Sequence, residues 1–202
     1  WLNAKNAFIL LIIFFGFLFI TQGEPFIRSD GYCYYHISKT LMNEGKFVTD
    51  KIPEYWNYMG QVRKGDGTVN CGPGTAIFLT PGLFIAGLFK GGATIQNDYF
   101  MAYNGHTLLE GFSILFTAII IGVIANILIY KTLHELKFGE RLSILVTAGT
   151  FLSSYVVWYI FLLPSFTHIY EYFSVVLAFW GIVKFLNSKK YIAFVKLLCN
   201  IY

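Results

Sequence analysis

The sequence is poor in charged residues, and this shortage indicates its class. Charged residues make up 13% of the 202 residues, whereas an ordinary soluble domain carries about 25%. Hydrophobic residues reach 56%, aromatic residues 19%, and long apolar runs recur along the chain. The net charge of +4 is modest, and no cluster of lysine and arginine is typical of a surface that binds nucleic acid. The composition therefore argues against a nucleic-acid partner and favours a protein that crosses the lipid bilayer several times.

Cysteine is scarce, and several well-known motifs are missing. The three cysteines, Cys33, Cys71 and Cys199, form neither a CxxC pair nor a zinc-binding spacing. Cys33 and Cys71 fall in the same region outside the long apolar runs, where they either form one disulfide or remain as two thiols. The chain has no glycosylation sequon, no Walker A motif and no GxGxxG motif. Its glycine-rich segments, 65–67 and 72–74, lack the lysine of a phosphate-binding loop and are interpreted as turns.

Four apolar stretches are long enough to cross a bilayer as helices, which requires about 20 residues each. They cover residues 6–23, 108–131, 142–163 and 166–186. The first stretch follows Lys5 and therefore also resembles a signal peptide, but it is too long, and no cleavage site of small residues comes after it. We predict an all-α membrane protein with about four transmembrane helices.

Residues 24–103, between the first two spans, form the predicted external loop. Within this loop, Asp30 to Glu44 has the apolar periodicity of an amphipathic helix, and Gly45 supplies a stop signal. A second segment, 75–89, is apolar but only about 15 residues long and contains Pro81, which is typical of an interfacial or re-entrant helix. The loop is therefore expected to hold amphipathic or interfacial helices rather than another span.

The basic residues predict which side of the membrane each loop faces. Lys5 precedes the first span, and further lysines and arginines lie between the second and third spans and after the fourth. If segment 75–89 does not cross, all these groups fall on the cytoplasmic side. If it does cross, Lys5 moves to the opposite side from the others. The first arrangement is preferred, and it places the loop 24–103 and the corner at 164–171 outside the cell, with the chain in the plasma membrane.

Three ionisable residues lie at this predicted outer boundary. His168 and Glu171 are three residues apart on a helix, so their side chains share one face. A carboxylate near the apolar zone is costly and often marks a functional site, although Glu171 fits equally well as a residue that extends to the interface or pairs structurally with His168. Asp30 is either a functional carboxylate or the N-cap of the helix that follows it.

The order of several segments resembles that of a known superfamily. One span leads into Ser29–Tyr35 and a helix that ends at Asn43–Phe47, Gly72–Pro81 follow the loop, a long span begins near Asn104, and Leu163–Phe173 form the next outer corner. This ordered set covers nearly the whole chain. It resembles the N-terminal part of the GT-C superfamily of polytopic glycosyltransferases, which includes the dolichyl-phosphate-mannose–protein mannosyltransferases and the bacterial lipid A aminoarabinose transferases.

The resemblance implies transfer of a sugar from a polyprenyl-phosphate donor to a glycan, lipid or protein acceptor on the extracytoplasmic face. It makes Asp30 the catalytic aspartate, because a carboxylate in that position takes the proton of the attacking acceptor hydroxyl. It implies that His168 and Glu171 hold the donor phosphate or a divalent metal ion. Most tyrosines at the outer boundary are interpreted as an aromatic belt, while Tyr34 and Tyr35 are candidates to stack on sugar in the substrate groove.

Two other classes of protein fit the same pattern. A small ion-coupled or proton-coupled transporter would use Glu171 and His168 as a relay through the bundle. A non-catalytic membrane scaffold would use Asp30 only to cap a helix. The chain begins at Trp1 and ends at Tyr202 within an apolar pattern, which predicts that it belongs to a longer protein.

Overall fold

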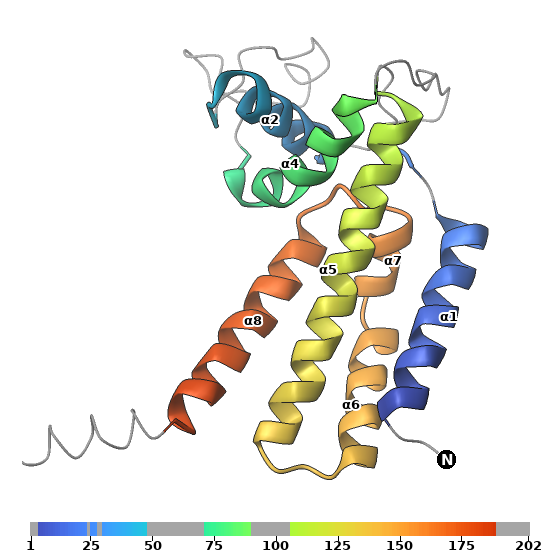
Figure 1. The fold of residues 1–202 in the computed structure, drawn as a ribbon, viewed down its shortest axis with the longest axis vertical. Coiled ribbons are helices and arrows are strands. Elements are labelled where there is room, and N and C mark those ends of the chain that lie inside the picture. The colour runs from blue at the N-terminus through green and yellow to red at the C-terminus, as the bar shows by residue number, and fades with distance from the viewer. Residues whose placement is uncertain (1–3, 24, 28–29, 48–70, 90–105, 189–202) are drawn as a thin grey trace, which may run out of the picture.

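The described part of the chain is mostly α-helical (Figure 1). The computed structural model describes residues 4–23, 25–27, 30–47, 71–89 and 106–188. Within these ranges there is no β-strand, and the helices are α1 (Ala4–Gln22), α2 (Gly31–Glu44), α4 (Pro73–Leu88), α5 (Leu108–Glu135), α6 (Glu140–Ser153), α7 (Val156–Phe161) and α8 (His168–Leu186). The predicted helical class is therefore confirmed for these residues.

Helix α5 is the centre of the fold, and α4, α6, α7 and α8 all pack against it. Its 28 residues span about 42 Å at the rise of an α-helix. The helix begins with a capping box, in which Glu110 N donates to Thr107 Oγ1 at 3.2 Å and Thr107 N donates to Glu110 Oε2 at 2.8 Å. Leu115 and Ala118 on this helix are fully buried. The cap and the packing together explain why α5 is long and continuous.

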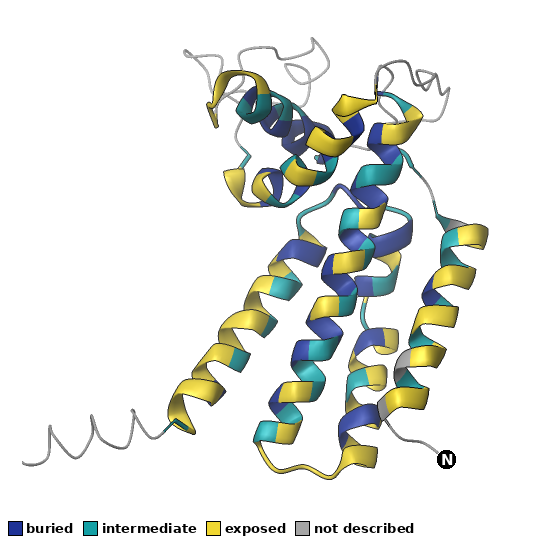
Figure 2. Ribbon diagram, viewed as in Figure 1, coloured by how far each residue is buried: buried dark blue, intermediate teal, exposed yellow. Residues whose placement is uncertain are grey.

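Two of the described helices, α5 and α8, are long and apolar enough to cross a membrane. Two shorter apolar helical stretches, Lys5–Thr21 within α1 and Pro73–Leu88, accompany them. The outer faces of α1 and α8 are largely exposed (Figure 2), and they include large apolar residues: Ile20 is 83% exposed and Val175 is 70% exposed. Extended apolar faces of this kind are typical of surfaces that contact lipid or another protein.

The span that the sequence predicts over residues 142–163 is not one continuous helix. It divides into α6 and α7, which follow one another along α5 (Figure 1). Ser154 has an extended backbone (φ −94°, ψ 158°), and its hydroxyl donates to Phe151 O at 3.0 Å and accepts from Val156 N at 3.4 Å. Serine hydroxyls compete with the helical backbone for hydrogen bonds, so this serine ends α6.

Helices α2 and α4 lie across one end of the bundle (Figure 1). Helix α2 is amphipathic as predicted, and its buried Ser38 donates a hydrogen bond from Oγ to Ala76 O of α4 at 3.0 Å. The helix ends at Gly45, which has a φ of 68°, a left-handed conformation that glycine adopts readily. The apolar segment predicted at 75–89 forms most of α4, and Pro81 lies inside that helix. These two helices pack together and form a cap on the bundle.

The helix directions define two distinct ends of the bundle. The last turns of α5 and α8 meet, because Lys184 Nζ lies 2.7 Å from Glu135 Oε1 and Asn187 Nδ2 donates to Glu135 O at 3.2 Å. The start of α1 and the loop between α5 and α6 lie at this same end (Figure 1). Helices α2 and α4 and the start of α8 lie at the other end. The start of α1 and the loop between α5 and α6 therefore lie at the opposite end of the bundle from the start of α8.

Candidate functional site

A pocket of about 410 Å³ lies where α2, α4 and α8 meet. One wall is Tyr34 of α2, and a second wall is the first turn of α4 with Gly72, Gly74 and Thr75. A Cβ atom added at Gly72 or Gly74 would meet no other atom within 4 Å, so the two glycines border open space. The N-terminus of a helix carries unpaired N–H groups and a partial positive charge. This wall of the pocket is therefore suited to an anion.

The third wall is the first turns of α8. Thr167, Tyr170, Glu171 and Ser174 line the pocket from this side. Tyr170 is buried, and its hydroxyl donates to Pro164 O at 3.1 Å, while its ring stacks on Phe78 of α4 with 5.4 Å between centroids. Thr167 Oγ1 donates to Glu171 Oε1. Tyr170 therefore fixes α8 against α4, and Glu171 remains directed at the pocket.

The start of α2 approaches the segment before α8 so closely that only glycine fits. A Cβ atom at Gly31 would collide with both Oγ and Cβ of Ser165. Ser165 is fully buried, so its side chain has little room to move away. This contact brings Asp30, the neighbour of Gly31, to the same corner as Glu171, although the two acids are far apart in the sequence.

A disulfide joins the first two walls of the pocket. Cys33 precedes Tyr34, Cys71 precedes Gly72, and the two cysteines are bonded, with 6.5 Å between their Cα atoms. The sequence left open whether these two residues pair, and the structure shows that they do. The bond ties the start of α2 to the start of α4 at the edge of the pocket.

Tyr34 lies within the electrostatic reach of both candidate acids. Its side chain is buried, and burial, followed by the negative charges of Asp30 and Glu171, raises the pKa of its hydroxyl from 10.0 to about 12. Tyr34 therefore stays protonated at neutral pH and offers a hydrogen-bond donor at the pocket wall. The sequence placed Tyr34 in the substrate groove and Glu171 at the donor phosphate or a metal ion, and both residues line this one pocket.

Asp30 occupies the N-cap position of α2, but its side chain makes no capping hydrogen bond. Asp30 is half-buried and is not one of the residues that line the pocket. It lies beside the pocket, near enough to Tyr34 for its charge to act on that hydroxyl. The interpretation of Asp30 as a helix cap alone is therefore not supported by its hydrogen bonding.

His168 and Glu171 form the predicted pair at the start of α8. His168 Nδ1 lies 3.4 Å from Glu171 Oε2, and their side chains are 51% and 66% exposed. The ring of His168 also lies 4.3 Å from that of Tyr159 of α7. The sequence predicted the last span from residue 166, two residues before this helix begins. The four residues from Pro164 to Thr167 form turns, so α8 begins at His168 and Glu171 lies in its first turn.

Tyr35, also expected in the groove, lies elsewhere. It is buried beside α5, where Lys39 Nζ lies 5.8 Å from its ring centroid. Lys39 Nζ also pairs with the buried Glu110 Oε1 at 2.6 Å. This ion pair between α2 and α5 was not predicted from the sequence. The capping-box spacing of Thr107 and Glu110 marked the start of α5, but it gave no sign that a lysine from α2 would reach the carboxylate.

The predicted divalent metal ion is not supported by a ligand set in the described part of the chain. No three His, Cys, Asp or Glu side chains gather there closely enough to hold a metal ion. His168 and Glu171 alone provide two ligand groups, and a structural or catalytic metal site usually has three or more protein ligands. Metal dependence therefore stays a prediction, and no step below relies on it.

The chain was compared with known proteins at the level of sequence families and of structure. No family model matches it, no curated protein matches it, and no solved structure matches it. The functional assignment therefore depends on the residues and geometry of the pocket itself.

Proposed function

We propose that this chain is a membrane glycosyltransferase that resembles the GT-C superfamily and transfers a sugar from a polyprenyl-phosphate donor to a glycan, lipid or protein acceptor. In this proposal α1, α5, α6 together with α7, and α8 form four spans in the plasma membrane. The pocket then opens on the extracytoplasmic face. The observation that carries the proposal is the position of Tyr34 at the wall of a pocket, under the influence of both Asp30 and Glu171.

Two walls of the pocket suit two parts of such a donor: the wall from α4 suits its phosphate, and the wall from α8 suits its sugar. The first turn of α4, at Gly74 and Thr75, favours the phosphate because helix N-termini bind anions. The carboxylate of Glu171 repels a phosphate and instead accepts hydrogen bonds from sugar hydroxyls. We therefore assign the phosphate to the first turn of α4 and the sugar to Glu171, in place of the phosphate or metal role first expected of Glu171 and His168; His168 is not one of the residues that line the pocket. The apolar outer face of α8, which includes Val175, continues from the pocket and suits the lipid tail.

Asp30 takes the role of general base. As the acceptor hydroxyl attacks the anomeric carbon, its proton passes to the Asp30 carboxylate. The bond between the anomeric carbon and the phosphate oxygen breaks, and the lipid phosphate leaves with that electron pair. The protonated Tyr34 hydroxyl donates a hydrogen bond nearby and helps to orient the sugar.

The test is sugar transfer by the Asp30→Asn variant in membranes, with a radiolabelled polyprenyl-phosphate sugar as donor. Loss of the general base is expected to lower the transfer rate by about 10²-fold to 10⁴-fold. Glu44→Gln is the matched control, because Glu44 is an exposed acid at the far end of the same helix. Unchanged transfer by Asp30→Asn would reject the proposed base.

A binding measurement accompanies the rate measurement. Asp30→Asn is expected to retain crosslinking to a photoreactive polyprenyl phosphate, while Gly74→Leu loses it by filling the pocket. Equal crosslinking of the Gly74→Leu variant and the unaltered chain would place the donor elsewhere.

The two rival functions receive less support from the geometry. A relay through the bundle requires ionisable groups within it, whereas His168 and Glu171 lie exposed at its end. A scaffold that uses Asp30 only as a cap requires a capping hydrogen bond, which its side chain does not make.

A further inference from the structure

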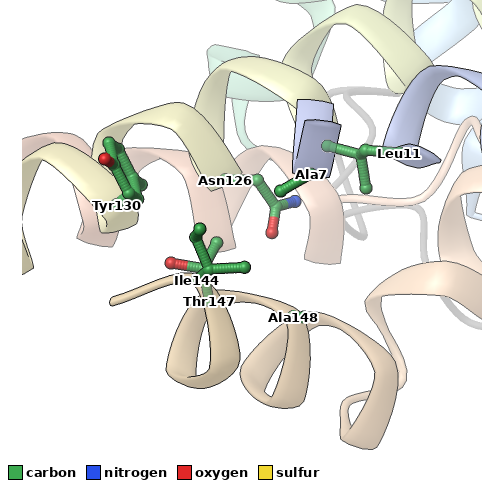
Figure 3. A pocket seen from close by; sticks show the side chains of 7 residues that line it. All are labelled: Ala7, Leu11, Asn126, Tyr130, Ile144, Thr147 and Ala148. Atoms are coloured by element: carbon green, nitrogen blue, oxygen red, sulfur yellow. The ribbon is translucent and has the colours of Figure 1, made fainter. Parts of the chain in front are cut away.

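A second cavity, of about 70 Å³, lies between α1, α5 and α6 (Figure 3). Leu11 of α1 and Ile144 and Ala148 of α6 give it mainly apolar walls. Its polar wall residues are Asn126 of α5 and Thr147 of α6, with Tyr130 one turn further along α5. Asn126 is nine residues from the end of α5, about 14 Å along the axis. The cavity therefore lies in the half of the bundle remote from the pocket of α2, α4 and α8.

Asn126 is a buried amide with one unused hydrogen-bonding atom. The residue is 2% exposed, and its Nδ2 donates to Gly122 O at 2.8 Å. Its Oδ1 is buried and accepts no hydrogen bond from any described group. Figure 3 shows its side chain projecting from α5 toward α6. A buried carbonyl oxygen without a donor is unfavourable, and it is more unfavourable in an apolar surrounding than at a surface.

The neighbouring side chain does not supply the missing donor. Thr147 Oγ1 already donates to Ser143 O at 2.7 Å, so its one proton is used within α6. Leu11, Ile144 and Ala148 have no polar side-chain atoms. Tyr130 does not supply it either, since Asn126 Oδ1 has no hydrogen-bond partner among the described groups. A molecule that enters the cavity can therefore supply the donor.

The walls of the cavity indicate what this molecule is. The volume is several times what one water molecule needs, but an ordered water requires two to four polar partners, and the walls are mainly apolar. An alkyl chain suits these walls, and a hydroxyl on it satisfies the amide. We propose that this cavity binds a single-chain amphiphile whose hydroxyl donates to Asn126 Oδ1 while its chain packs against Leu11, Ile144 and Ala148. The cavity is bordered by α1, which contacts the bundle mainly through α6 and α7. We therefore expect the alkyl chain of the amphiphile to enter beside α1.

The proposal is tested by photolabelling the purified chain in lipid bilayers with a diazirine-bearing long-chain alcohol and with the matching alkane. Labelled peptides from α5 and α6 are quantified by mass spectrometry. The alcohol is expected to label these peptides about tenfold more than the alkane does, a difference that one hydrogen bond in an apolar site provides. In Asn126→Leu, which keeps a similar side-chain size but removes the acceptor, alcohol labelling is expected to fall to the level of the alkane.

A cavity-filling variant and a control complete the design. Ala148→Leu keeps the acceptor but occupies the cavity, so labelling of α5 and α6 by both probes is expected to fall. Ala178→Leu, an exposed substitution on α8, is expected to leave both unchanged. Equal labelling by alcohol and alkane in the unaltered chain would overturn the proposal. An alcohol preference that persists in Asn126→Leu, with helicity retained by circular dichroism, would overturn it as well.

Discussion

At the scale of single residues, the contact between Gly31 and Ser165 determines whether the pocket forms. Gly31→Ala would place a methyl group against the buried Ser165, and overpacking of this kind costs about 1–3 kcal/mol of the free energy of unfolding. We expect a lower thermal unfolding temperature in detergent micelles and weaker crosslinking of a photoreactive polyprenyl phosphate at the pocket. Both effects follow from the displacement of Asp30 and α2 from the start of α8.

Two further variants test this explanation. Gly74→Ala adds a methyl group where no other atom lies within 4 Å, so it is expected to leave the unfolding temperature nearly unchanged. Adding Ser165→Gly to Gly31→Ala removes the collision and is expected to recover part of the lost stability. A Gly31→Ala variant as stable as the unaltered chain would show that the close contact does not constrain the fold.

The residue scale also shows what the sequence could predict about the site. The sequence placed Tyr34 in the substrate groove, and Tyr34 lines the pocket together with Glu171. The same prediction for Tyr35 does not match the structure. Adjacent residues on a helix point to different faces, and Tyr35 lies toward Lys39 of α2 and Glu110 of α5 instead. No sequence pattern could reveal that Gly31 meets Ser165, since that contact depends on the tertiary packing of two distant segments.

At the scale of elements, the disulfide between Cys33 and Cys71 holds the start of α2 next to the start of α4. It closes a loop with a sequence separation of 38, which lowers the conformational entropy of the unfolded chain and corresponds to about 4 kcal/mol of stabilisation. Reduction with dithiothreitol is therefore expected to lower the unfolding temperature of the chain and to weaken crosslinking at the pocket. The Cys33→Ser, Cys71→Ser double variant is expected to have the unfolding temperature of the reduced chain, and dithiothreitol is expected not to change that temperature. An unfolding temperature insensitive to both changes would contradict this role.

Some helices were predicted correctly from the sequence and others were not, and the difference has physical reasons. Helix α2 and its end at Gly45 followed from apolar periodicity and a glycine stop, which are local signals. The division of 142–163 at Ser154 was not predicted, because hydropathy measures how apolar a stretch is and does not detect a serine that competes for backbone hydrogen bonds. The last span was predicted from residue 166, whereas α8 begins at His168, because Phe166 is apolar but does not belong to the helix.

At the scale of the whole molecule, the bundle has two chemically different ends. The meeting of α5 and α8 at Glu135 and Lys184 defines one end, and the helices α2 and α4 cap the other. The larger pocket lies at the capped end, and the cavity beside Asn126 lies in the opposite half. If the bundle spans a bilayer as proposed, these two sites face different leaflets, so a ligand at one reaches the other only through the packing of α5.

This placement predicts opposite accessibility for two exposed basic residues. Lys46 follows α2 at the capped end, and Arg141 lies in the first turn of α6 at the other end. In a background with Cys199→Ser, single cysteines at these positions are labelled in intact cells with a membrane-impermeant maleimide. We expect labelling of the Lys46→Cys variant from outside and labelling of Arg141→Cys only after permeabilisation, because basic loops remain in the cytoplasm. Labelling of both positions from outside would contradict the four-span arrangement and remove the reason for placing the pocket on the extracytoplasmic face.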